Sequence, residues 1–167
     1  MAVRGEAVHA LHPKHVLAGA VGAGATVCPA LAQQLQALSQ RRVLRAYAAD
    51  ELIGCSTAYA ILEYRLGLIS GLYWNAAHLA RFKGLQLVPF AAGGLLSSRS
   101  DALFDRFFGE VGGGLRALVD WGGVQPGLFA VDAGWPLSRC SNTYVDSSGL
   151  LQRRPPFGLY LSFDQAF

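Results

Sequence analysis

Glu63, Arg65 and His78 are the residues of this sequence whose types best suit chemistry. Glu63 and Arg65 stand between two uncharged stretches, residues 52–62 and 66–80, and His78 lies in the second. A carboxylate, a guanidinium and an imidazole around one pocket could bind a small molecule or perform simple chemistry on it. One hypothesis is therefore a soluble α+β domain, either a small-molecule-binding domain or an enzyme, with its pocket at these three side chains.

Three histidines near the start have a spacing that a metal site could use. His9, His12 and His15 lie three residues apart, which would place them on one face of a helix. Pro13 removes a helix hydrogen bond between them, and no cysteine or carboxylate follows at a recognisable ligand spacing. We therefore predict no metal here.

Motifs for nucleotide binding and nucleophilic catalysis are missing from the sequence. Gly19, Gly22 and Gly24 form G-x-x-G-x-G rather than the dinucleotide-binding G-x-G-x-x-G, and no acidic residue lies about 20 positions further on. The sequence also contains no G-x-x-x-x-G-K-[ST], G-x-S-x-G or H-E-x-x-H. It predicts no catalytic residue and no cofactor, and no family is recognised from it.

The composition indicates a surface that is largely covered. Of the 167 residues, 52% are hydrophobic and only 15% are charged, with a mean hydropathy of +0.30; soluble domains average about 25% charged residues. Residues 15–40 contain no charged side chain. The net charge of +3 and the lack of a basic stripe give no reason to expect nucleic acid as a partner. Lipid and other protein subunits are the expected partners.

Hydrophobic spacing predicts a mainly α fold with a few helices. Apolar residues in the range 30–49 recur with the period of an amphipathic helix. A long central helix is expected from about residue 50 to about residue 80, with two acidic residues at its N-terminus. A further helix is expected after Ser98. We divide the chain into a helical, apolar region, residues 1–120, embedded in a membrane or buried by a partner, and an extended, irregular C-terminal arm carrying short strands, residues 121–167.

Small residues are expected to form helix-packing surfaces. Gly67 and Gly71 make a GxxxG motif on the central helix, and Gly19 and Gly22 lie in an earlier stretch of Ala, Gly and Val. Glycines at this spacing let a second helix approach closely. On the same helix Glu63 and Arg65, two residues apart, would point to nearly opposite sides and could not pair with each other.

Three smaller expectations concern strands, glycines and cysteines. Residues 84–90, 128–131 and 158–163 are expected to be extended or to form short strands, and the glycine triplet 112–114 should kink or break a helix, or mark the close approach of another backbone. The odd number of cysteines, at positions 28, 55 and 140, predicts reduced and mostly buried thiols.

Two hypotheses for function follow. The first is a non-catalytic accessory or structural subunit of a large, membrane-associated and energy-transducing complex, for which an organellar inner membrane is a natural location. Such a subunit would stabilise assembly through its helices. The second is the soluble domain with a pocket at Glu63, Arg65 and His78.

Overall fold

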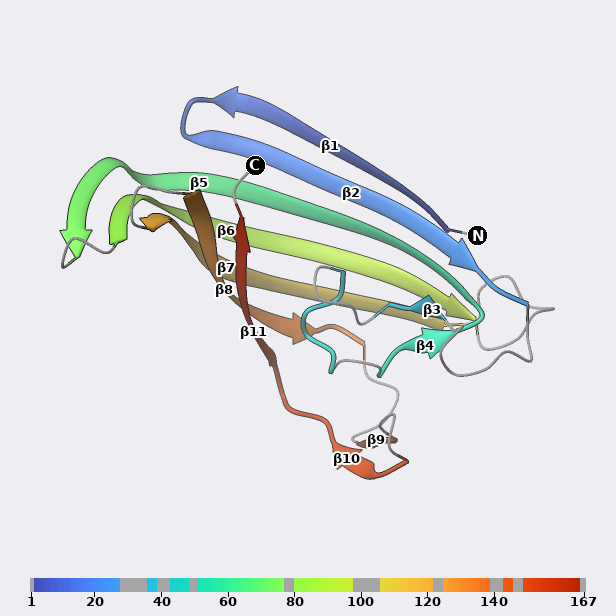
Figure 1. Ribbon diagram of the computed structural model, residues 1–167. Coiled ribbons are helices and arrows are strands. Elements are labelled where there is room, and N and C mark those ends of the chain that lie inside the picture. Colours follow the sequence, from blue (N-terminus) through green and yellow to red (C-terminus); the bar gives the residue numbers. More distant parts are fainter. Residues whose placement is uncertain are drawn as a thin grey trace.

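The structure is a computed structural model that describes residues 2–27, 36–38, 43–48, 51–76, 80–97, 106–121, 125–138, 143–145 and 149–165. Every regular element in these ranges is a β-strand (Figure 1). The strands are β1 (Ala2–His12), β2 (His15–Ala25), β3 (Gln36–Ala37), β4 (Ile53–Gly54), β5 (Ser56–Ala76), β6 (Ala80–Ser97), β7 (Arg106–Trp121), β8 (Gln125–Pro136), β9 (Thr143–Val145), β10 (Leu151–Arg153) and β11 (Gly158–Gln165).

Seven strands form one antiparallel sheet in the order β1-β2-β5-β6-β7-β8-β11. Two short pairs, β3 with β4 and β9 with β10, form separate two-stranded sheets. Successive long strands are mostly neighbours in the sheet, so its connections are local hairpins, apart from the segment between β2 and β5 and the segment between β8 and β11. These two segments carry the small sheets.

The predicted mainly α fold is wrong. The expected central helix is strand β5, and the helix expected after Ser98 is replaced by strand β7. The expected strands at 84–90, 128–131 and 158–163 do exist and lie within β6, β8 and β11. However, β8 and β11 belong to the main sheet rather than to an irregular arm. The division of the chain at residue 120 stays a prediction.

The helix-packing role of the glycines is also wrong. Gly19 and Gly22 lie on β2, and Gly67 and Gly71 lie on β5. Gly67 donates a backbone hydrogen bond to the carbonyl of Lys14, and Gly71 has a φ of 75°, in the left-handed region that favours glycine. In the described ranges, no helix is long and apolar enough to span a membrane.

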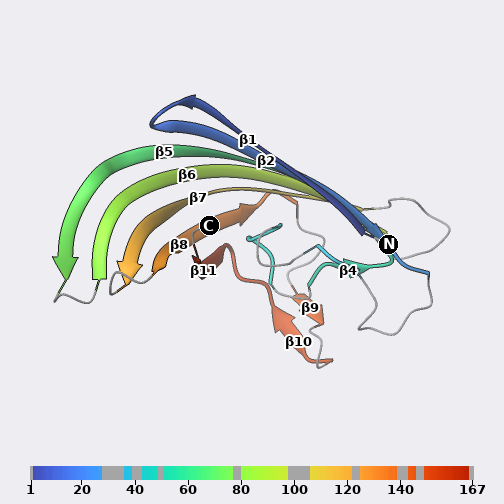
Figure 2. The ribbon, with the colours of Figure 1, turned by 45° about the horizontal axis from the view of Figure 1, so that its top comes forward.

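The sheet curves strongly, so that it has a concave and a convex face (Figure 2). Residues 43–48, which we call the inner segment, lie together with β3 and β4 on the concave side. There Leu44 and Tyr47 of the inner segment pack with Phe108 of β7 in one buried cluster. The main hydrophobic core therefore lies inside the curve. Its buried members are Leu38, Val43, Leu44, Ala46, Tyr47, Leu52, Ala92, Leu96 and Phe108.

Side chains alternate between the two faces along each strand. On β5, Leu62 is exposed on the convex face and Glu63 is buried on the concave face. Register continues this division across the sheet, because directly opposed residues share a face. One convex row crosses five strands without a polar side chain: Leu66, Leu87, Leu115, Val131 and Leu161.

Cys55 is disulfide-bonded, so the prediction that all three thiols are reduced is wrong. The other two cysteines, at positions 28 and 140, lie outside the described residues. The backbone N–H of Thr26 donates to the carbonyl of Cys55 at 2.7 Å, which brings the end of β2 beside this cysteine.

Candidate functional site

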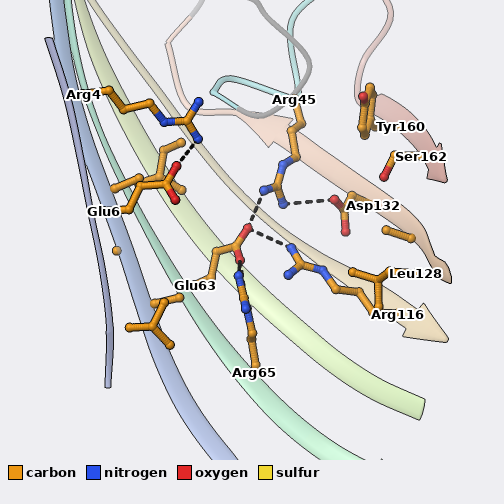
Figure 3. Close-up of a pocket in the computed structure, with 16 residues that line it drawn as sticks. Arg4, Glu6, Arg45, Glu63, Arg65, Arg116, Leu128, Asp132, Tyr160 and Ser162 are labelled. Atoms are coloured by element: carbon orange, nitrogen blue, oxygen red, sulfur yellow. Dashed lines mark hydrogen bonds and ion pairs between the residues drawn. The ribbon is translucent and has the colours of Figure 1, made fainter. Parts of the chain in front are cut away.

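Glu63 is the centre of a buried charge network on the concave face (Figure 3). Its Oε1 accepts a hydrogen bond from Arg116 Nη2 at 2.8 Å and another from Arg45 Nη2. Its Oε2 accepts from Arg65 Nη2 at 3.1 Å and from Arg65 Nε at 3.3 Å. One carboxylate therefore holds three guanidinium groups, which come from β5, β7 and the inner segment.

Arg45 reaches this network from the inner segment. Its Nη1 lies 3.0 Å from Asp132 Oδ2, and its guanidinium carbon lies 4.4 Å from the centre of the Phe90 ring. The next residue, Ala46, donates its backbone N–H to Glu110 Oε2 at 2.6 Å. Acidic groups on β5, β7 and β8 thus fix both the side chain and the backbone of the inner segment.

Two glycines provide the surface on which the inner segment rests. Gly134 of β8 and Gly158 of β11 are directly opposite each other in the sheet. A Cβ at Gly158 would lie 2.2 Å from the Arg45 carbonyl oxygen, and one at Gly134 would lie 3.1 Å from the Ala46 nitrogen. Any side chain at Gly158 would therefore displace the inner segment, because a real Cβ does not approach backbone atoms this closely.

The three buried carboxyl groups of the site differ in their pKa values. Burial would raise the pKa of Glu63, but the hydrogen bonds and charges of Arg116 and Arg45 outweigh burial and lower that pKa from 4.5 to about 2. Burial raises the pKa of Asp132 despite the opposing charges of Arg45 and Arg116. Burial likewise raises the pKa of Glu110, against the backbone hydrogen bonds that it accepts. Glu63 is thus the only one of these three groups whose pKa is lowered.

A cavity of about 210 Å³ lies beside the network on the concave side. Arg116, Arg65 and Glu63 line it, together with the hydroxyl-bearing Tyr160 and Ser162 of β11. Among the described lining residues there is no histidine or cysteine. A carboxylate with a pKa of about 2 is a poor base near neutral pH, so Glu63 suits binding and positioning rather than proton transfer.

The structure brings together two of the three pocket residues expected from the sequence. Glu63 and Arg65 bind each other, because residues two apart on a strand share a face. The expectation that they could not pair is therefore wrong, while His78 lies outside the described residues. Within the described part of the chain, no group of His, Cys, Asp and Glu is arranged to hold a metal.

Sequence reasoning missed Arg45, Arg116, Asp132 and Glu110 as members of the site. A period of two was available in β7, where Glu110 and Arg116 fall on the same face, with Gly112 and Gly114 between them on that face. Arg45 carried no such indication, because it lies on a segment without regular structure.

No family model, curated protein or solved structure matches this chain.

Proposed function

We propose that this protein is a non-catalytic structural component of a membrane-associated assembly, in which the convex face of its sheet contacts lipid. One observation carries the proposal: the convex row of five apolar residues described above. Leu115, Val131 and Leu161, all in this row, are 46%, 46% and 68% exposed. Without a partner, this continuous apolar surface would be in contact with water, and exposing apolar surface to water is unfavourable.

Neighbouring rows extend the same apolar surface. Leu62 on β5 and Val111 on β7 are exposed on the convex face, and Ala91 of β6 lies between them in register. Arg45, Glu63 and Asp132, in contrast, are buried on the concave face. Apolar residues on one face and charges on the other are the arrangement expected when lipid covers the first face.

The two edges of the sheet explain why the proposed component belongs to an assembly. Among the described strands, β1 pairs only with β2 and β11 pairs only with β8. All residues of β1 are exposed. Lipid offers no hydrogen bonds to the backbone of an edge strand, so a sheet in a membrane needs partners along its edges. We infer that other strands of the assembly pair with β1 and β11.

The disulfide at Cys55 supports a location in an oxidising compartment, because disulfides seldom persist in the cytosol. The convex face and this disulfide together favour a membrane with an oxidising environment on at least one side. That the assembly is an energy-transducing complex, and that its membrane is an organellar inner membrane, stay predictions from the sequence.

The test uses two valines of similar exposure on opposite faces. Val21 on the convex face is 58% exposed, and Val8 on the concave face is 66% exposed. The full chain would be reconstituted with phosphatidylcholine vesicles and floated on a density gradient. We expect the native protein to float. Val21→Arg should float poorly, since arginine facing the middle of a bilayer costs roughly 2–4 kcal/mol.

Val8→Arg is the matched control and should float like the native protein, because its side chain faces the concavity. Circular dichroism in detergent would confirm that both variants retain the strand content. Native protein that stays at the bottom of the gradient would contradict the proposal. Equal flotation of the two arginine variants would contradict it as well, since no face would then be lipid-facing.

A further inference from the structure

Within the described ranges, the cavity on the concave face is lined by one more positive than negative side chain: Arg4, Arg45, Arg65 and Arg116 against Glu6, Glu63 and Asp132. Among the described residues, Arg45, Arg65 and Arg116 form ion pairs with the carboxylates of Glu63 and Asp132. The buried Glu110 lies near Arg45 but outside the cavity lining. The nearby Arg4 and Glu6 are paired with each other and leave this balance unchanged. The cavity beside the network therefore has an excess of positive charge.

One buried hydrogen-bond donor at the cavity is unused in the described part of the chain. Arg116 uses Nη2 for Glu63, and its Nε is buried without a hydrogen-bond partner among the described residues. Its side chain is 9% exposed. A buried donor without an acceptor destabilises the fold unless a ligand or a water accepts its hydrogen bond. Arg65 uses Nε and Nη2, both for Glu63.

Two hydroxyl groups lie on the other side of the same cavity. Tyr160 and Ser162 both point from β11 toward the concave side, near Asp132 (Figure 3). A hydroxyl can donate to an anion as readily as it accepts. The cavity of about 210 Å³ has room for several waters, and hence for a small anion with some of its hydration.

We propose that this cavity binds a small oxyanion, of which phosphate is the model, between the guanidinium groups of Arg116 and Arg65 and the hydroxyls of Tyr160 and Ser162. Guanidinium groups recognise phosphate and carboxylate oxygens through charge-assisted hydrogen bonds. This site goes beyond the proposed structural role, since it depends on the concave face and not on contact with lipid.

The oxyanion could be free phosphate or the phosphate of a lipid headgroup, and two probes distinguish these sources. The full chain in an uncharged, phosphate-free detergent would be titrated calorimetrically with inorganic phosphate and, separately, with glycerol 3-phosphate at constant ionic strength. Saturable binding of inorganic phosphate assigns the free anion. Binding of glycerol 3-phosphate alone assigns a headgroup.

Arg65→Gln is the most informative variant. Arg65 is the most exposed of the three arginines that hold Glu63, and Glu63 keeps its other two partners without it. We expect the dissociation constant to rise at least about tenfold, as for the loss of one charge-assisted hydrogen bond. Tyr160→Phe removes one hydroxyl and keeps the ring, and it should weaken binding by a smaller factor.

Arg81→Gln is the matched control, because it removes one exposed positive charge on β6 at a position outside the cavity lining. It should bind the anion like the native protein. Circular dichroism would verify that each variant is folded. The proposal is overturned if the native chain binds neither probe, or if Arg65→Gln and Arg81→Gln weaken binding equally.

Discussion

Gly114 of β7 lies directly opposite Asp132 of β8, and the Asp132 carboxylate occupies the space that a side chain at position 114 would need. A Cβ at Gly114 would lie 1.7 Å from Asp132 Oδ1. Because Gly114 has no side chain, the carboxylate can lie close to the sheet while its Oδ2 stays 3.0 Å from Arg45 Nη1. The glycine thus helps to determine where the inner segment binds.

Gly114→Ala should therefore destabilise the fold, while Gly113→Ala should not. A Cβ at Gly113 meets nothing within 4 Å, so this neighbour is a matched control. We expect a loss of about 1–3 kcal/mol for Gly114→Ala, typical of overpacking, and a change within about 0.5 kcal/mol of zero or slightly stabilising for Gly113→Ala. Denaturant unfolding in detergent measures both, and equal midpoints would show that Asp132 can move without cost.

Glu63→Gln should be among the most damaging single substitutions in the described part of the chain. It removes the negative charge that Arg45 and Arg116 share, and both arginines are buried. Arg45 keeps its ion pair with Asp132, but Arg116 loses the carboxylate that it binds. Leaving a buried charge without compensation costs about 3–5 kcal/mol.

Glu6→Gln makes the same chemical change where Glu6 is 57% exposed and paired with Arg4. An exposed pair contributes about 0–1 kcal/mol, so this control should be nearly neutral in the same unfolding measurement. A similar loss in the two variants would mean that the network on the concave face does not hold the fold together.

Acid should remove the contribution of Glu63 to stability. Its pKa is lowered from 4.5 to about 2 on folding, so the unfolded chain binds this proton more readily than the folded one. The contribution, about 3 kcal/mol, is complete above about pH 4.5 and is lost as the pH falls toward 2. Unfolding free energies between pH 7 and pH 3 should decrease in this window. The decrease should be smaller in Glu63→Gln, and parallel curves would contradict this assignment.

Cys55 should be found linked to Cys28 rather than to Cys140. The hydrogen bond from Thr26 to Cys55 holds the chain just before Cys28 beside Cys55, and these three are the cysteines of the sequence. Peptide mapping by mass spectrometry without reduction decides between the two pairings. A Cys55–Cys140 peptide would show the alternative, and reduction should lower stability by about 2–4 kcal/mol in either case.

The sequence predicted an apolar protein with a polar site at Glu63 and Arg65, but it misled about secondary structure. On β5 the concave face carries Tyr59 and Ile61, which pack against the core, while the convex face carries Leu62. Both faces are therefore apolar over much of the strand, and the alternation that identifies a half-buried strand disappears. A long apolar stretch without alternation resembles a buried helix.

The charged site could be predicted only in part, because its members are distant in sequence. Glu63 and Arg65 are close enough for a local pattern to identify both. Arg116 and Asp132 join them through the register of the sheet, and Arg45 joins through the docking of an irregular segment. No local periodicity contains the information that places these residues together. The glycine triplet 112–114 was expected to kink or break a helix, or to mark the close approach of another backbone. It lies in a strand instead, where a Cβ at position 112 or 114 would meet the side chain of Phe90 or Asp132 as well as backbone.

The paired glycines under the inner segment impose an order on the assembly of the chain. Gly158 lies on β11, so the surface that receives Arg45 and Ala46 is complete only after residues 46–157 have been synthesised and the final strand has joined the sheet. Contacts between such distant residues form slowly, because a long loop must close first. Before β11 joins, Glu63, Asp132 and Glu110 can already hold the inner segment, but the surface beneath it is incomplete, and a chaperone could recognise this intermediate.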